Sequence, residues 1–290
     1  MSHHAEDGLI PFNQGARALV PYYDDGQVAI YHGDCREVLP TLGIDASLTV
    51  TSPPYWNARS YGGDVFWPTY EAYLEWVREV LSVLMGRTGW LVWVAGYIWQ
   101  DGRMYDCSGD AARIAEAVGY VRRQQVPWVK SDYAPQPSID LAPAHELIQI
   151  LEGRNAVAGN WDTLRVTRRQ AERLGRVASE RPADGAQRGG GVGWGHERGD
   201  GKKQAPNVLV TQKLNGNDRL GHPAAFPPDV VSPWIQVCSR PGDLVLDPFM
   251  GSGTTLRVAK NWGRRAIGVE IEERYCEQAA RRMGQGVLAL

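Results

Sequence analysis

The chain has 290 residues, of which 43% are hydrophobic and 22% charged, and its formal net charge is −2. These values are ordinary for a globular protein of one or two domains. No apolar run approaches the roughly 18 residues of a membrane span, and the chain does not start with a signal-peptide pattern. The four cysteines are scattered without a Cys-x-x-Cys pair, so we expect no disulfide framework and no metal site. We therefore predict a cytoplasmic protein without a membrane partner.

Apolar runs alternate with stretches of helical spacing along most of the chain. Residues 28–32 predict a strand, and Asp34 is placed to cap a short helix that Pro40 ends. Further strands are expected at residues 48–50, 90–94, 121–130, 147–151, 244–246 and 265–269, and further helices at 73–84, 110–118, 229–238, 256–262 and 272–283. This alternation predicts an α/β fold with a mostly parallel sheet.

The predicted strand at residues 48–50 is followed by the run Thr51-Ser52-Pro53-Pro54-Tyr55-Trp56. Two consecutive prolines fix φ at both positions, so the backbone here is rigid. Taken alone, the run is compatible with a plain tight turn followed by core aromatics. The loop at residues 57–68 then contains two glycines and several aromatics, and either closes over a substrate or simply connects two elements.

The composition changes at Glu152. Residues 151–219 carry 13 Lys/Arg against 8 Asp/Glu, a net charge of +5, which leaves −7 for the rest of the chain. Eight glycines fall between residues 185 and 201, so this segment cannot bury a core of its own. A basic segment within an acidic body either is a solvated surface or contacts nucleic acid.

A glycine loop follows the strand at 244–246, in the run Asp247-Pro248-Phe249-Met250-Gly251-Ser252-Gly253-Thr254-Thr255. Gly251 and Gly253 lack a Cβ, so a ligand can approach the backbone closely, and the helix start behind them favours an anion. The next strand ends in Glu270, where an acidic residue is placed to bind ribose hydroxyls. No second phosphate loop is evident, so a nucleoside ligand without a pyrophosphate fits best.

The Ser-Pro-Pro-Tyr run and the Asp-Pro-Phe glycine loop together resemble the amino-group DNA methyltransferases that use S-adenosylmethionine. The catalytic run precedes the glycine loop, and this order is similar to the beta-type permutation of that family. The resemblance covers about residues 28–283 apart from the divergent insert. It implies a Rossmann-like class I methyltransferase sheet in circularly permuted order. Residues 1–151 would then form the catalytic half, 152–219 an inserted and partly flexible target-recognition region, and 220–290 the cofactor-binding half.

The resemblance also implies roles for individual residues. The catalytic residues are Ser52, Pro53, Pro54 and Tyr55, with Trp56 supporting Tyr55. The cofactor residues are Asp34, Phe226, Asp247, Phe249, Gly251, Gly253, Thr254 and Glu270, although Asp34 can equally be a plain helix cap. The residues expected to contact double-stranded DNA are Arg165, Arg168, Arg169, Lys202 and Lys203.

Ser52 at the first catalytic position implies methylation of cytosine at its exocyclic N4 after base flipping, with the N6 of adenine as the alternative. Methylation of cytosine carbon 5 is not expected, because no cysteine follows a proline in this chain. An alternative from another class is a non-catalytic nucleic-acid-binding subunit. A prokaryotic or phage-encoded, nucleoid-associated enzyme is expected, and both a homodimer and a cognate restriction endonuclease acting on the same site are compatible with it.

Overall fold

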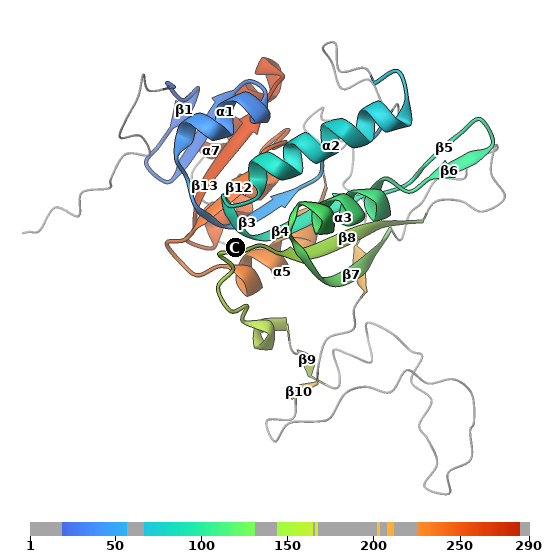
Figure 1. The fold of residues 1–290 in the computed structure, drawn as a ribbon. Coiled ribbons are helices and arrows are strands. Elements are labelled where there is room, and N and C mark those ends of the chain that lie inside the picture. The colour runs from blue at the N-terminus through green and yellow to red at the C-terminus, as the bar shows by residue number, and fades with distance from the viewer. Residues whose placement is uncertain are drawn as a thin grey trace, which may run out of the picture.

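The computed structural model describes residues 19–56, 67–130, 144–164, 166–167, 202–203, 208–211 and 226–284. Within these ranges nine strands form one sheet in the order β1-β2-β13-β12-β3-β4-β8-β7-β11 (Figure 1). They are β1 (Tyr23–Asp24), β2 (Val28–His32), β3 (Ala46–Thr51), β4 (Thr88–Ala95), β7 (Val121–Lys130), β8 (His145–Glu152), β11 (Leu209–Thr211), β12 (Leu244–Asp247) and β13 (Arg265–Glu270). The short strands β5 (Ile98–Gln100) and β6 (Arg103–Tyr105) form a separate hairpin.

The direction of the strands decides where their ends meet. Strands β2, β13, β12, β3 and β4 run parallel to one another, whereas β8 is antiparallel to both β4 and β7. Strand β11 pairs parallel with β7, and β1 forms an antiparallel edge on β2. The prediction of a mostly parallel α/β sheet is thus confirmed, and the carboxyl ends of five neighbouring strands lie at one edge.

Helices cover both faces of the sheet. They are α1 (Cys35–Leu42), α2 (Tyr70–Leu84), α3 (Cys107–Val118), α5 (Pro228–Cys238), α6 (Thr254–Asn261) and α7 (Glu273–Gly284). All eight residues of β4 are buried, and they alternate between two cores. Leu91 and Trp93 pack with α1, α2 and α3, while Trp90 and Val92 pack with α5, α6 and α7. A continuous apolar run is what a parallel strand covered on both faces requires.

The first helix continues past the proline that was expected to end it. Asp34 caps α1 by accepting the N–H of Arg36, but Pro40 lies inside the helix, which ends at Gly43 with a φ of 57°. The prediction that Pro40 ends the helix is therefore wrong. Buried Leu39 and Leu42 hold the last turn against the core, and this tertiary contact offsets the loss of one backbone hydrogen bond.

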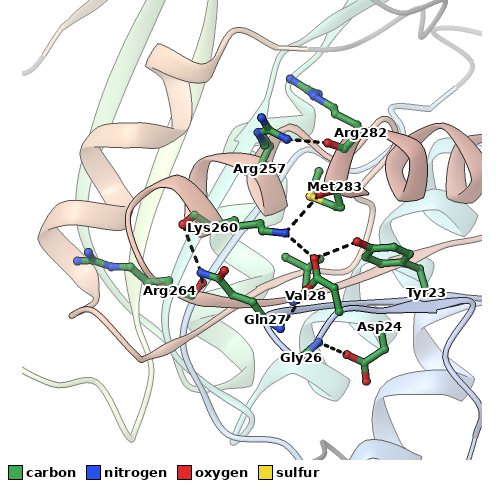
Figure 2. A network of polar contacts seen from close by, with 11 residues as sticks. Tyr23, Asp24, Gly26, Gln27, Val28, Arg257, Lys260, Arg264, Arg282 and Met283 are labelled. Atoms are coloured by element: carbon green, nitrogen blue, oxygen red, sulfur yellow. Dashed lines mark hydrogen bonds and ion pairs between the residues drawn. The ribbon is translucent and has the colours of Figure 1, made fainter. Parts of the chain in front are cut away.

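A polar network fastens the first strands to the last two helices (Figure 2). The ammonium of Lys260 in α6 contacts the carboxylate of Asp25 and the carbonyl of Met283 in α7. Gln27 donates through its amide to the carbonyls of Lys260 and Arg264, at 3.3 and 3.1 Å. Residues more than 230 positions apart are joined in this way, so β2 and β13 form one rigid unit with α6 and α7.

Part of the segment predicted as an insert belongs to the body of the fold. Strand β11 adds to the large sheet beside β7. The indole of Trp90 donates to the carbonyl of Val157 at 2.8 Å, and its ring meets that of Trp161 in the 3₁₀ helix η1 (Trp161–Leu164). Both ends of the 152–219 segment are thereby attached to the body, although the domain division itself stays a prediction. In the described ranges no helix has the length and apolar character needed to cross a membrane.

Candidate active site

The carboxyl ends of four neighbouring strands bring the two sequence motifs together. Strands β2, β13, β12 and β3 are adjacent in that order. Leu246 in β12 is in register with Thr49 in β3, and Glu270 in β13 is in register with His32 in β2. The Ser-Pro-Pro-Tyr run and the glycine loop therefore start from the same edge of the sheet, and Glu270 lies beside them.

A buried hydrogen bond joins the two motifs directly. The hydroxyl of Thr51 donates to Oδ1 of Asp247 at 2.8 Å, although 196 positions separate the two residues. The same oxygen accepts the N–H of Phe249 at 3.1 Å. Asp247 is 2% exposed, and its burial raises the pKa of the carboxyl to about 6. Asp247 thus links the first motif to the second from inside the protein.

This raised pKa makes stability depend on pH in a defined direction. Between about pH 4 and 6 the folded protein binds a proton at Asp247 that the unfolded chain has released, so this group lowers stability as the pH rises, by at most about 1.4 kcal/mol per pH unit. The substitution Asp247→Asn keeps an acceptor for Thr51 and Phe249 but removes the titrating group. As the pH rises through this window, the free energy of unfolding of the wild type should fall relative to that of Asp247→Asn. Urea unfolding at about pH 4.5, 5.5 and 7.5 measures both free energies. A difference between the two proteins that stays the same at all three pH values would contradict the raised pKa of Asp247.

Glu270 holds the glycine loop in place. Its Oε2 accepts the N–H of Gly251 at 2.9 Å and its Oε1 accepts the N–H of Glu272, also at 2.9 Å. Burial raises the pKa of Glu270, although these N–H groups oppose the shift. The backbone carbonyl of Glu270 accepts the N–H of Gly33, so the end of β2 closes the site on this side. The positive φ of Gly251, 50°, gives the turn that brings its N–H to the carboxylate.

Gly253 has a structural reason for being a glycine that the sequence did not show. Its φ is 78°, and a Cβ on it would lie 3.0 Å from the Cβ of Ala279 in α7. The close approach at Gly253 is therefore to a helix of this chain. The hydroxyl of Thr254 likewise accepts from the guanidinium of Arg282 at 3.2 Å. These two predicted cofactor residues contact α7 and set where helix α6 begins.

The remaining predicted cofactor residues surround this edge. Hydrogen bonds from the side chain and N–H of Arg36 outweigh the effect of partial burial and lower the pKa of Asp34, whose carboxylate acts as a cap and an ion-pair partner. Phe249 is half-buried with its ring centroid 5.5 Å from that of Trp76 in α2. Phe226 is 8% exposed and packs with the residues of α5, α6 and α7.

The predicted catalytic run follows β3 as a turn that Trp56 anchors. Pro53 is buried, whereas Ser52, Pro54 and Tyr55 are half-buried and reach the surface of the edge. Trp56 is 6% exposed, donates through its indole to the carbonyl of Trp67 and packs against the rings of Tyr70 and Tyr105. Trp56 thus anchors the turn from within the core, directly after Tyr55.

A charged pair that no motif pointed to lies beside this turn, and one of its members contacts Tyr55. The hydroxyl of Tyr55 donates to Oε2 of Glu146 at 3.0 Å, and Oε1 of Glu146 pairs with the ammonium of Lys130. Glu146 lies at the start of β8 and Lys130 at the end of β7. Neither position stands out in the sequence. The pairing of β4 with both β3 and β8 brings Glu146 near Tyr55, and the antiparallel pairing of β7 with β8 brings Lys130 to Glu146.

The residues predicted to bind DNA are described only in part. Arg165, Arg168 and Arg169 lie outside the described residues, as do residues 57–66 of the predicted flap. Lys202 and Lys203 form the short strand β10, which pairs antiparallel with β9 (Val166–Thr167). No group of three or more His, Cys, Asp or Glu side chains that could hold a metal ion occurs among the residues that the structure places.

A mostly parallel sheet that ends in a Ser-Pro-Pro-Tyr turn beside a glycine loop and a buried acidic residue defines an α/β methyltransferase. A family model described as DNA methylase, covering N6 and N4 enzymes, matches residues 46–281. The chain belongs to this family of amino-group DNA methyltransferases, which confirms the resemblance that the two motifs indicated.

Known proteins with similar sequence or structure agree with this membership. The type II methyltransferase M.ScaI of Streptomyces caespitosus is 27% identical over 283 residues, which are 91% of this chain and 83% of that protein. The cytosine-N4-specific PvuII DNA methyltransferase has a similar fold, with a TM-score of 0.66 and 21% identity over 93% of this chain and 90% of that one. A putative DNA modification methylase from Thermus thermophilus, solved with S-adenosyl-L-methionine, is 26% identical with a TM-score of 0.58 over 90% and 95% of the two chains.

Proposed function

We propose that this protein transfers a methyl group from S-adenosylmethionine to the exocyclic N4 of cytosine in duplex DNA after flipping the base out of the helix. The observation that carries the proposal is the placement of Ser52-Pro53-Pro54-Tyr55 at the end of β3, hydrogen-bonded through Thr51 to the glycine loop after β12. The catalytic run precedes the glycine loop in sequence although their strands are neighbours. This supports the circularly permuted form of the class I methyltransferase fold.

The residues around the glycine loop fit S-adenosylmethionine. When bound, this cofactor supplies a methyl group already activated by a positively charged sulfur. The buried carboxyl groups of Asp247 and Glu270 lie at this edge, where negative charge favours a cation. Each Glu270 oxygen accepts one backbone N–H and, as a carboxylate oxygen, retains further capacity for a ribose hydroxyl.

The chain's own part in the chemistry is to prepare the nitrogen. An exocyclic amino group is a poor nucleophile because its lone pair is delocalised into the ring. Two acceptors, the hydroxyl of Ser52 and the carbonyl of Pro53, take hydrogen bonds from its two N–H groups and favour a tetrahedral nitrogen. The two prolines hold that carbonyl in a fixed direction, so alignment requires no further ordering of the backbone.

The target base has to leave the duplex before its amino group can reach these acceptors. Tyr55 is half-buried directly after the two prolines. In this proposal its ring stacks on the flipped base. Trp56, the next residue, is anchored in the core and holds the turn in place. The basic residues of the 152–219 segment, among them Arg165, Arg168, Arg169, Lys202 and Lys203, would hold the phosphates of the double-stranded DNA.

The product decides between the candidate activities. Unmethylated plasmid DNA, incubated with the full chain and S-adenosylmethionine, is digested to nucleosides and analysed by mass spectrometry. We expect methyl groups on cytosine N4 and none on cytosine carbon 5. N6-methyladenine would keep the enzyme class and overturn the choice of base, while DNA binding without methyl transfer would indicate a non-catalytic subunit.

The cellular setting follows from the same proposal. A type II methyltransferase such as M.ScaI is similar to this chain over most of its length. Protection of a site from a cognate restriction endonuclease is the corresponding role here, in the cytoplasm of a prokaryote and encoded either by the cell or by a phage. A plasmid carrying the gene, once isolated, would then resist one restriction enzyme that cuts a plasmid without it.

A further inference from the structure

The hydroxyl of Tyr55 meets an ion pair formed by side chains of β7 and β8. This hydroxyl donates to Oε2 of Glu146 at 3.0 Å, and the other oxygen of Glu146 pairs with Lys130. The side chains of Glu146 and Lys130 are only 18% and 23% exposed. The hydroxyl end of the Tyr55 side chain is therefore held by an ion pair that is largely shielded from solvent.

The residue that follows β4 lies against both Glu146 and Tyr55. Gly96 follows β4, and a Cβ on it would lie 3.2 Å from Cγ of Glu146 and 3.6 Å from Cε2 of Tyr55. The first distance is tighter than an ordinary carbon contact, so any larger residue at 96 would displace the Glu146 side chain. The absence of a side chain at Gly96 lets both residues lie against the backbone.

The pair is also held from its far side. The ammonium of Lys130 lies 4.9 Å from the ring centroid of Trp128, within the range of a cation–π contact. The indole of Trp128 in turn donates to the hydroxyl of Thr211 in β11 at 2.7 Å. Strands β7, β8 and β11 thus support Glu146 and Lys130 on rigid elements, which is what a precisely held contact requires.

Stability does not explain why this pair is charged. A largely buried ion pair gains little over an apolar pair of similar size, because desolvation offsets the attraction. A charged acceptor does, however, bind a phenol hydroxyl more strongly and with a narrower geometry than a neutral one. The charge of the pair is therefore better explained by its effect on the Tyr55 ring than by a gain in the stability of the fold.

We infer that Glu146 is a positioning residue of the methyltransferase: it fixes the position of the Tyr55 ring, and Lys130 in turn fixes Glu146. The inference rests on the proposed stacking of the flipped base on Tyr55. The hydrogen bond to Glu146 restricts rotation of the tyrosine side chain about its Cα–Cβ bond, and the Gly96 backbone beside Cε2 restricts rotation of the ring about its Cβ–Cγ bond. The base that stacks on the ring then presents its amino group to Ser52 and to the Pro53 carbonyl at a single angle.

The test is a double-mutant cycle in the full-length protein, with methyl transfer to unmethylated plasmid DNA as the readout. Tyr55→Phe removes the hydroxyl and leaves the Glu146–Lys130 pair intact, while Glu146→Ala removes the acceptor. Each change is expected to lower kcat by roughly tenfold, because small misplacements of a reacting group are costly. Tyr55→Phe combined with Glu146→Ala is expected to lose roughly tenfold as well, since both changes break the same contact.

Two further variants separate positioning from simple structural support. Glu146→Gln keeps an acceptor for the Tyr55 hydroxyl and should retain kcat within about threefold of the wild type. Glu152→Ala removes the carboxylate that pairs with Arg123 at 2.8 Å on the same two strands, far from Tyr55, and should leave kcat unchanged. The KM for S-adenosylmethionine should be unaltered in all variants, because none of the substituted residues is among the predicted cofactor residues, of which Asp247 and Glu270 end β12 and β13.

The outcomes distinguish this inference from the proposed function. Losses that multiply to roughly a hundredfold in the double variant, or a tenfold loss in Glu146→Gln as large as that in Glu146→Ala, would overturn the positioning role while methyl transfer itself stands. A kcat for Tyr55→Phe equal to that of the wild type would overturn it too. Absence of methyl transfer by the wild-type protein would instead refute the proposed function.

Discussion

Replacing Ser52 with alanine is expected to lower the turnover number for methyl transfer about a hundredfold, which corresponds to about 3 kcal/mol of transition-state stabilisation. In the proposed mechanism, Ser52 supplies one of the two acceptors for the target amino group. Ser52→Ala keeps both prolines, Tyr55 as the proposed stacking residue and the buried Trp56, so the flipped base should still enter the site. The KM for DNA is therefore expected to change little, and the loss should fall almost entirely on kcat.

Steady-state assays with labelled S-adenosylmethionine and unmethylated DNA measure this effect. Ser47→Ala is the matched control, since Ser47 lies on the same strand β3 but near its other end. Its turnover should equal that of the wild type. Full activity in Ser52→Ala would refute the catalytic role proposed for the Ser-Pro-Pro-Tyr run.

Replacing Glu270 with alanine is expected to weaken S-adenosylmethionine binding by about 2–4 kcal/mol, the loss of two hydrogen bonds to a charged acceptor. The structure adds a second consequence, because Glu270 also accepts the N–H groups of Gly251 and Glu272. A loosened glycine loop therefore contributes to the loss as well. An analogue of the cofactor that lacks ribose hydroxyls separates the two contributions.

Titration calorimetry with the cofactor and with its deoxyribose analogue provides the comparison. Wild-type protein should bind the analogue more weakly than the cofactor, whereas Glu270→Ala should bind both with similar affinity. Glu272→Ala is the control, because the Glu272 side chain pairs with Arg274 and only its backbone N–H reaches Glu270. If Glu270→Ala still discriminates between cofactor and analogue as the wild type does, another residue holds the ribose.

Several properties of the site were accessible from the order of residues alone. The alternation of apolar runs and helical stretches predicted the α/β class, because a strand buried on both faces must be apolar throughout. The Ser-Pro-Pro-Tyr run and the glycine loop indicated the family, because their chemistry depends on neighbouring residues: two fixed φ angles in one motif and a turn before a helix in the other. Their position at strand ends also followed from the sequence.

One expectation failed where a distant contact outweighed a local preference. Pro40 was expected to end α1, but the burial of Leu39 and Leu42 carries that helix to Gly43. Gly253 also has a structural reason to be a glycine that the sequence did not show, because a Cβ there would lie 3.0 Å from the Cβ of Ala279, and its role toward a ligand stays a prediction. Local rules describe the preference of each residue in isolation, and packing against the core can override that preference.

What the amino-acid sequence determined by itself was therefore the fold class, the family and the two motifs, since each is written in residues that are close along the chain. Only the tertiary structure decided that Thr51 bonds Asp247 and that Glu146 bonds both Tyr55 and Lys130. Such pairs arise because the sheet places distant strands side by side to bury both of its faces. Burial of both faces of the sheet therefore determines which residues meet at its carboxyl edge. The residues adjacent to Glu146 in the sequence do not indicate which residue it will contact.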